Sequence, residues 1–524
     1  MSEPVQPDFT VDSTDYEVGQ DNVQILGLDI HNPVFMISAV TIVGFVIFTL
    51  MFQEGTAAFF GWLRPWLTST FDWVFMSAAN IFVLFCLFLV VSPWGRIRLG
   101  GADATPDFSY AGWFAMLFAA GMGIGLMFFG VLEPVYHFQN PPLGVNPEDV
   151  EAARAMGMAA TIFHWGLHPW AIYAVVALSL AFFTFNNGLP LTIRSAFYPL
   201  LGDRVWGWPG HIIDTLAVFA TLFGLATSLG FGAEQASAGL EYLFGIPATD
   251  VTKVALIIAI TAVALISVVA GLEAGVKRLS EINMVLALAL LLFVIIAGPT
   301  LAVLTGFFTN AGHYFVNVLS LSNFVNRQDF DFMHGWTTFY WAWWISWSPF
   351  VGMFIARVSR GRTVREFIVC VLIIPTLVSI LWMTAFGGTA IEQIVADDYQ
   401  GVAETVAAYV PELSLFKMLE VLPLTMVSSF LGIILVIVFF VTSSDSGSLV
   451  IDTITAGGKT DAPVVQRVFW ATFEGLVAIT LLLGGGLASL QAAAIATGFP
   501  FAVVLVVMCW CTFKGLRADP QMAR

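Results

Sequence analysis

The chain has 524 residues, of which 58% are hydrophobic and 11% are charged, and its formal net charge is −16. This composition excludes a water-soluble globular domain, because apolar runs of about 20 residues recur along the chain and each is long enough to span a bilayer. The acidic residues lie mainly in the N-terminal tail and in loops, and no nucleic-acid partner is expected.

Twelve apolar runs follow one another, and each predicts a membrane-spanning helix. They centre on residues 34–53, 72–93, 110–132, 158–185, 210–232, 253–271, 281–303, 335–356, 366–388, 424–450, 466–485 and 489–512. We therefore expect an all-α polytopic membrane protein. Residues 1–31 would form an acidic cytoplasmic tail, 32–515 the transmembrane domain and 516–524 a short cytoplasmic tail.

Basic residues are distributed unevenly among the loops. Those near the run ends follow even-numbered runs, as at Arg96, Arg194, Lys277, Arg360 and Lys459. Loops after odd-numbered runs carry few bases and many acids. Because loops rich in Lys and Arg stay in the cytoplasm, both termini are predicted to be cytoplasmic in a multi-pass protein of the cell (inner) membrane.

Glycines at 121, 123 and 125 punctuate the third run, which reads AAGMGIGL from Ala119. Each glycine weakens a helix by roughly 1 kcal/mol relative to alanine. One interpretation is close helix packing, which small residues permit in membranes. The other is an unwound stretch that lines a cavity, with free N–H groups for an anion and free carbonyls for a cation.

The fourth run reads HWGLHPWAIY from His164. On one continuous helix, Trp165, Trp170 and Tyr173 fall within about 140° of arc and can line one wall of a pocket. His164 and His168 are four residues apart, but no carboxylate or cysteine lies near them in the sequence. Packing or bonding to the backbone is therefore favoured over a metal site.

The eighth run is dense in tryptophan, at positions 336, 341, 343, 344 and 347. Trp344 and Trp347 are neighbours on a helix face, and Ser348 with Pro349 predicts an interruption of the helix. Indole faces attract quaternary ammonium groups by about 2 kcal/mol when desolvated, which favours an aromatic cage for a cation. An aromatic belt at the membrane interface is the alternative, and it suits Trp336 better.

Interruptions in the third and eighth runs would lie five runs apart. Corresponding breaks of this kind point to inverted repeats with a binding site near the membrane midplane. Runs 3–7 and 8–12 would then be the two repeats, and the first two runs would be extra helices that precede them.

The tenth run ends in TSSDSGS from Thr442. Hydroxyls and a carboxylate within a span are costly, which favours a functional role. Their oxygens suit a hard cation such as Na⁺. The alternative is that the hydroxyls bond back to helix carbonyls. Glu474, in the eleventh run, is expected to pair within the bundle.

Together these segments resemble the betaine/choline/carnitine transporter family. The likeness extends from about residue 30 to 515 and rests on GMGIG (121–125), HWGLHPWAIY (164–173), WTTFYWAWWISWSPFVGMFIARVSRGRTVREF (336–367) and TSSDSGS (442–448). It implies a LeuT-type fold of two inverted five-helix repeats, assembled as a homotrimer in membrane lipid. It also implies a transporter of a small onium or zwitterionic substrate, and not an enzyme.

The resemblance also implies roles for individual residues. Trp165, Trp170, Tyr173 and Trp344 would form an aromatic box, with Trp347, Gly121, Met122, Gly123 and Gly125 as further substrate contacts. Phe339 and Phe350 would be gates. A Na⁺ site would use Ala119, Met122, Phe439, Thr442 and Ser443. A second Na⁺ site would include Thr221, but Leu225 stands where the family has another threonine.

The leading hypothesis is a secondary active transporter that imports glycine betaine, or a related compatible solute, by Na⁺ symport through alternating access. Na⁺ is the coupling ion and no other cofactor is expected. Gly125, where proton-coupled choline carriers of the family tend to have Asp, and the retained Thr442 and Ser443 favour this hypothesis. The alternatives are a carrier of choline, carnitine, ectoine or dimethylsulfoniopropionate, or a sodium-independent substrate:product exchanger.

Overall fold

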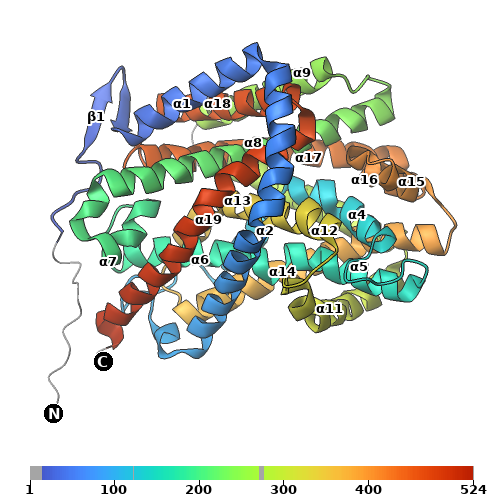
Figure 1. Cartoon of the computed structure of the whole chain (residues 1–524), viewed down its shortest axis with the longest axis horizontal. Helices are drawn as coiled ribbons and strands as arrows, with labels where there is room; N and C mark the ends of the chain where they lie inside the picture. The colour runs from blue at the N-terminus through green and yellow to red at the C-terminus, as the bar shows by residue number, and fades with distance from the viewer. Residues whose placement is uncertain (1–13, 122, 271–275, 523–524) are drawn as a thin grey trace.

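The computed structural model describes residues 14–121, 123–270 and 276–522, and these are almost entirely helical (Figure 1). Within them, ten helical stretches are long and apolar enough to cross a membrane. They are α1 (Val34–Met51), α2 (Gln53–Val91), α5 and α6 together (Val150–Phe185), α8 (Trp208–Phe244), α9 (Asp250–Ala270), α10 (Val276–Ala297), α14 (Val364–Val395), α17 (Thr425–Thr455), α18 (Val464–Leu483) and α19 (Gly486–Ala518).

The two other predicted spans are also helical. The third run forms α3 (Tyr110–Gly121) and α4 (Ile124–Gln139), each too short to cross alone, and the eighth forms α13 (Thr338–Arg357), whose tryptophans lower its hydropathy. Twelve spans therefore stays a prediction. A further long helix is α11 (Thr300–Ser322). The shorter elements are β1 (Asn22–Ile25), β2 (Leu28–His31), α7 (Tyr198–Leu201), α12 (Phe330–Phe332), α15 (Gly401–Ala407), α16 (Ser414–Glu420) and several single turns.

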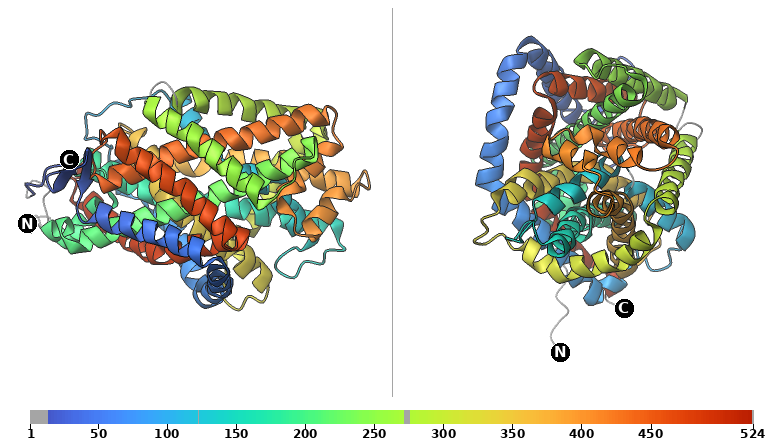
Figure 2. Two further views of the ribbon diagram at one scale, coloured as in Figure 1. Left: turned by 90° about the horizontal axis from the view of Figure 1, so that it is seen from above. Right: turned by 90° about the vertical axis from the view of Figure 1, so that its right-hand side faces the viewer.

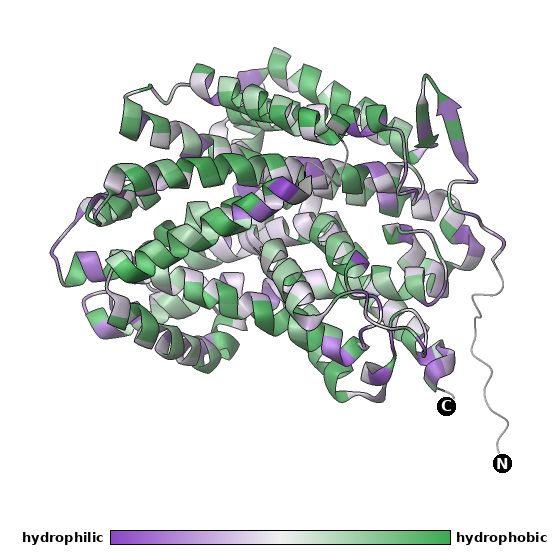
Figure 3. Ribbon diagram, turned by 180° about the vertical axis from the view of Figure 1, so that it is seen from behind, coloured by the Kyte–Doolittle hydropathy of each residue, from purple (hydrophilic) through white to green (hydrophobic). Residues whose placement is uncertain are grey.

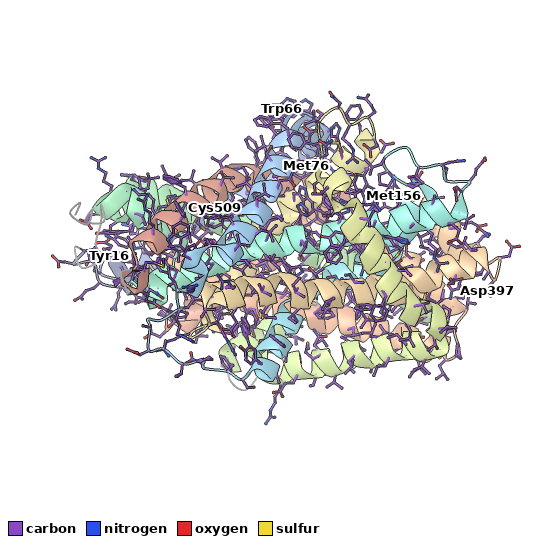
Figure 4. All side chains as sticks on the ribbon, turned by 90° about the horizontal axis from the view of Figure 1, so that it is seen from below. Tyr16, Trp66, Met76, Met156, Asp397 and Cys509 are labelled. Carbon is purple, nitrogen blue, oxygen red and sulfur yellow. The ribbon has the colours of Figure 1, made fainter. Side chains whose placement is uncertain are left out.

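Most long helices run along the longest dimension of the molecule, and Tyr16 and Asp397 lie at its opposite ends (Figure 4). The helices are covered by hydrophobic residues, as Figure 3 shows. This is expected in lipid, where a helix satisfies its own backbone and exposes apolar side chains. The β1–β2 hairpin and the last turns of α19 lie at the same end (Figures 1 and 2). The side of the membrane that this end faces stays a prediction.

Part of the predicted acidic tail is folded. β1 and β2 form an antiparallel hairpin that contacts the loop after α17. Asp29 pairs with Lys459 at 2.6 Å, and the Asn22 side-chain amide donates to the Ala456 carbonyl at 2.8 Å. Tyr16 stacks on Trp206 with a 4.0 Å separation of ring centroids. Residues 14–31 are thereby attached to the ends of two long helices.

The third run is interrupted, as one of its two interpretations predicts. α3 ends at Gly121 and α4 begins at Ile124, and Gly123 between them is extended, with φ −169° and ψ −177°. Polar side chains from neighbouring helices bond to carbonyls in the first turn of α4. Trp382 Nε1 donates to the Leu126 carbonyl at 3.0 Å, and Gln235 Nε2 donates to the Met127 carbonyl at 2.9 Å.

The fourth run is also interrupted, which the sequence interpretation missed. α5 ends at Trp165 and α6 begins at Leu167, with Gly166 between them. A Cβ atom at Gly166 would lie 2.7 Å from the Ile162 carbonyl oxygen, so only glycine fits this close approach. The backbone N–H of Leu167 donates to the Tyr314 hydroxyl of α11 at 3.0 Å, which satisfies a donor at the break.

The predicted interruption of the eighth run is wrong, because α13 continues through Pro349. A proline within a helix leaves the carbonyl four residues earlier without its backbone donor. Here that carbonyl belongs to Ile345, and the Ser348 hydroxyl donates to it at 2.7 Å. The paired breaks that suggested inverted repeats are therefore absent, and the repeats stay a prediction from the family resemblance.

Candidate functional site

Four aromatic rings from three helices lie around one cavity. Trp165 ends α5, Trp170 and Tyr173 lie on the first turns of α6, and Trp344 lies in α13. The ring centroids of Trp165 and Trp344 are 4.9 Å apart, and those of Tyr173 and Trp344 are 6.2 Å apart. The cavity is lined by Gly123, Gly125, Leu126, Trp165, Pro169, Trp170, Tyr173, Trp343, Trp344, Trp347 and Ser379.

Because the third and fourth runs are interrupted, the four rings and the start of α4 can reach the same cavity. The break at Gly166 separates Trp165 from Trp170, so the two rings do not have to share one helix face. The break at Gly123 brings the N-terminus of α4 to the cavity wall, at Gly125 and Leu126. A helix N-terminus carries unpaired N–H groups and partial positive charge, which suit a carboxylate. The cavity therefore combines aromatic faces with one electropositive end.

Three indole N–H groups of the lining tryptophans point away from the cavity. Trp165 Nε1 donates to Glu133 Oε2 at 2.7 Å, and Trp344 Nε1 donates to the His164 carbonyl at 2.9 Å. Trp343 Nε1 donates to the Gly224 carbonyl at 3.3 Å. With their polar edges bonded outside, these rings turn apolar surface inward, and the negative face of an indole attracts a desolvated cation.

Glu133 lies behind the aromatic rings and bonds to the indole of Trp165. The sequence analysis did not predict it as a site residue. Its Oε1 lies 2.6 Å from His164 Nδ1, and its Oε2 accepts hydrogen bonds from Trp165 and from the Tyr340 hydroxyl. The other ring nitrogen of His164 lies 2.8 Å from the Thr337 hydroxyl. An acid at the end of an apolar run was the available signal, because acids in membrane-spanning segments are rarely without a function.

This arrangement corrects the expectation that no carboxylate lies near the histidines of the fourth run. Ligand atoms of Glu133, His137 and His164 lie within 4.8 Å of one another. His164 bonds to Glu133 and to the Thr337 hydroxyl, which are side chains and not the backbone that the sequence analysis favoured, so hydrogen bonding accounts for it. His168 is separate: its Nε2 lies 3.1 Å from Asn80 Oδ1, and its ring stacks on Trp341.

Two donors on the cavity wall are free. Among the described residues, neither Trp347 Nε1 nor the Tyr173 hydroxyl has a hydrogen-bond partner, although both atoms are buried. A buried unpaired donor costs about 1–3 kcal/mol, so such groups call for an explanation. A bound molecule with an acceptor group would satisfy them.

A second cavity of about 110 Å³ lies on the other side of Trp347. It is lined by Ala119, Ser280, Trp347, Phe350, Val351, Phe354, Thr442, Ser443 and Ser446. Three of the five residues predicted to hold Na⁺ are therefore on its wall: Ala119, Thr442 and Ser443. Phe439 is not, but its carbonyl accepts from the Thr442 hydroxyl at 3.2 Å. Met122 lies outside the described residues.

The hydroxyls of the tenth run also bond back to their own helix. Thr442 Oγ1 lies 3.0 Å from the Val438 carbonyl, and Ser448 Oγ donates to the Asp445 carbonyl at 2.9 Å. This is the alternative that the sequence left open, and it coexists with the cavity. A threonine that donates its proton to the helix still presents its oxygen lone pairs as acceptors.

The remaining predicted residues lie at or beyond the edges of the two cavities. Phe350 meets Trp347 edge-on at 5.4 Å, and Phe339 stacks on Trp343 at 5.5 Å. Gly121 is the last residue of α3. Thr221, within α8, donates to the Ala217 carbonyl at 2.7 Å and lines neither of the two cavities.

Comparisons with known proteins found one family model and several relatives. The model of the betaine/carnitine/choline family transporters matches residues 33–521. A protein of Vibrio parahaemolyticus named as a glycine betaine/proline/choline transporter is 62% identical, over 99% of this chain and 97% of its own. A glycine betaine transporter of that organism is 56% identical, over 98% and 99%. A glycine betaine transporter of Acinetobacter baylyi is 45% identical, over 93% and 74%.

Proposed function

The chain belongs to the betaine/carnitine/choline family of transporters, which are not enzymes, and on this basis we propose that it imports glycine betaine by Na⁺ symport. Its relatives support a betaine-type solute as the substrate. The coupling ion, the individual site residues and the mechanism of alternating access are parts of the proposal.

The observation that carries the proposal is the complementarity of the aromatic cavity to a zwitterion. The faces of Trp165, Trp170, Tyr173 and Trp344 would hold a trimethylammonium group, whose charge cannot form hydrogen bonds. The carboxylate would accept from the Trp347 indole and from N–H groups of the first turn of α4. A zwitterion has a cationic and an anionic group, so it would use both the aromatic faces and the N–H donors. Choline lacks the carboxylate and would use only the aromatic faces.

The free space inside the cage is small. It amounts to about 30 Å³, which is room for about two water molecules. A solute of seven or more heavy atoms can enter only if the rings move apart. A carrier that opens to one side at a time would supply that motion, so the closed cage agrees with the proposed alternating access.

Coupling to Na⁺ would operate through Trp347, because this side chain lines both cavities. A cation held by oxygens of Ala119, Thr442 and Ser443 would fix the end of α3 against α17. The cage lies immediately beyond, so the ion would favour the geometry that binds the solute. A sodium-independent exchanger is the competing mechanism.

Uptake of labelled glycine betaine into proteoliposomes tests the proposal, with and without a Na⁺ gradient. The variants are Trp344→Ala and Trp344→Phe, with Trp510→Ala as a control, since Trp510 is exposed on the outside of α19. Trp344→Ala should raise KM by tenfold or more, for a loss of about 2 kcal/mol, and Trp344→Phe should raise it less.

Separate outcomes contradict the parts of the proposal. Unchanged uptake by Trp344→Ala would place the substrate elsewhere. A rate that stays flat across a Na⁺ titration would exclude symport and leave the exchanger.

A further inference from the structure

Two buried acidic side chains lie on the neighbouring helices α17 and α18. Asp445 lies in α17 and Glu474 in α18, and they are 1% and 0% exposed. The Ser444 hydroxyl, next to Asp445, donates to Glu474 Oε2 at 3.4 Å. An ion pair shows how the two helices are aligned: Asp452 of α17 lies 3.8 Å from Arg467 of α18. Asp445 comes seven residues before Asp452, and Glu474 comes seven residues after Arg467. In this antiparallel register Asp445 and Glu474 lie opposite each other.

Each carboxyl group has one oxygen without a partner. Asp445 Oδ2 accepts from Ser267 of α9 at 2.6 Å, whereas Asp445 Oδ1 and Glu474 Oε1 have no hydrogen-bond partner among the described residues. The hydroxyl of Thr261, which lies beside Gly475 on the facing side of α9, is also unpartnered within that same part of the chain. Unpaired buried carboxylates are costly, and two like charges at one level add to the cost.

Most other charged groups on the surrounding helices have partners of their own. On α8, Asp214 pairs with Arg194 and Glu234 pairs with Lys253 of α9. On α16, Lys417 pairs with Glu420, and on α4 Glu133 bonds to His164. α10 carries Lys277, Arg278 and Glu281 among its first six residues, and α1 has no charged residue. Arg467, paired with Asp452, is the nearest cation along α18, two turns from Glu474.

We propose that Asp445 and Glu474 form a binding site for one proton, which the two carboxyl groups share. One carboxyl carries the proton and donates it to the unpartnered oxygen of the other, so a single hydrogen bond satisfies Asp445 Oδ1 and Glu474 Oε1. The pair then holds one negative charge instead of two, as buried carboxyl pairs do elsewhere. This site is distinct from the cavity at Thr442 and Ser443.

A proton fits this site better than a metal cation does. A hard cation takes about six oxygen ligands, commonly with backbone carbonyls among them. Within the part of the chain that the structure describes, three unpartnered side-chain oxygens lie here: Asp445 Oδ1, Glu474 Oε1 and Thr261 Oγ1. α9, α17 and α18 are continuous helices at this level, so their carbonyls are used within the helices.

Infrared difference spectroscopy on the purified full-length protein at pH 7 tests the assignment, because protonated and ionised carboxyl groups absorb at different frequencies. The double variant Asp445→Asn/Glu474→Gln is compared with the parent protein. The expected loss is one protonated carboxyl band and one carboxylate band. Asp397→Asn, which removes an exposed loop carboxylate, calibrates the intensity of a single group.

Two outcomes overturn the proposal. Loss of two carboxylate bands would mean that both groups are ionised, and loss of two protonated bands would mean that no proton is shared. Should this double variant fail to fold, Asp445→Ala/Glu474→Met, which also removes both carboxyl groups, carries the same expectation and the same two refuting outcomes. The readout requires no transport, so it is independent of the proposed function.

Discussion

Glu133 and Trp165 are joined by a 2.7 Å hydrogen bond from the indole nitrogen to the carboxylate. A buried negative charge therefore lies directly behind a ring whose face lines the cavity. The bond fixes the orientation of the ring, and the carboxylate adds to the negative potential that a cation meets inside. Because Glu133 does not line the cavity, it acts as a positioning residue.

Replacing Glu133 should weaken recognition of the onium group. Glu133→Gln keeps the size of the side chain but removes the charge and replaces one acceptor oxygen by a donor. A hydrogen bond to a charged group is worth about 1.5–3 kcal/mol, so KM for betaine should rise by about ten- to a hundredfold. Uptake kinetics measure this, with Glu234→Gln, at a pair remote from the cage, as the control. A KM equal to that of the parent would remove Glu133 from the site.

Two glycines of the third run should respond differently to alanine. A Cβ atom at Gly125 would lie 2.8 Å from Trp165 and 3.1 Å from Trp343, whereas one at Gly123 would meet Trp347 at an ordinary 3.7 Å. Gly125→Ala should therefore displace the cage ring and reduce betaine affinity about tenfold or more, with Gly123→Ala close to the parent. Quenching of tryptophan fluorescence by betaine reports binding directly. Equal effects of both substitutions would contradict this geometry.

An acidic residue at Gly125 adds a charge to the steric effect. Gly125→Asp would place a carboxylate beside that of the zwitterion, where like charges in a low-dielectric site repel by several kcal/mol. Choline lacks a carboxylate, so the ratio of choline to betaine uptake should rise above that of Gly125→Ala. Competition between labelled betaine and choline in vesicles measures the ratio. The same ratio in both variants would mean that position 125 does not face the carboxylate.

Removing the hydroxyls of Thr442 and Ser443 should weaken activation by Na⁺. Thr442→Val with Ser443→Ala keeps the volume of the cavity wall but takes away two oxygens. We expect the Na⁺ concentration for half-maximal uptake to rise about tenfold, for the loss of about 1.4 kcal/mol. Thr453→Val is the matched control, since this hydroxyl bonds only to the Leu449 carbonyl of the same helix. Identical Na⁺ curves for the double variant and the parent would locate the ion elsewhere.

The N-terminal hairpin should loosen in acid because of His31. Burial, together with Arg194 and His211, lowers the pKa of His31 from its ordinary value of 6.5 to about 3. The docked hairpin thus excludes the protonated ring. Its docking is fully stable above pH 6.5 and weakens as the pH falls towards 3, by up to about tenfold per pH unit.

Hydrogen exchange of residues 22–31 at pH 7, 6 and 5, corrected for intrinsic rates, measures this loosening. In His31→Leu, which cannot be protonated, the protection of the hairpin should not depend on pH in this way. His313→Leu, on α11, serves as the control and should behave as the parent does. Parent protection that stays constant from pH 7 to 5 would show that His31 does not control the docking.

The sequence by itself determined the class of the protein and predicted the residue types of its candidate site. In lipid, the backbone N–H and C=O groups of an apolar run must bond to each other, and a helix achieves this within one run. The positions of the helices could therefore be predicted from the apolar runs. The cage rings and the Thr442–Ser443 pair were recognised because their chemistry is unusual within apolar runs and because the motifs resemble one family. These inferences need only local pattern.

Only the tertiary structure decided where helices break and what lies behind the rings. Whether Gly166 or Pro349 interrupts its helix depends on partners from elsewhere: Tyr314 of α11 bonds to the backbone beside Gly166, and Ser348 satisfies the carbonyl that Pro349 leaves free. The role of Glu133 depends on bringing α4, α5 and α13 together, and that of Glu474 on the register of α18 against α17. A hydrogen bond between residues far apart in the chain leaves no periodic pattern in the sequence, so its partners emerge only when the helices pack.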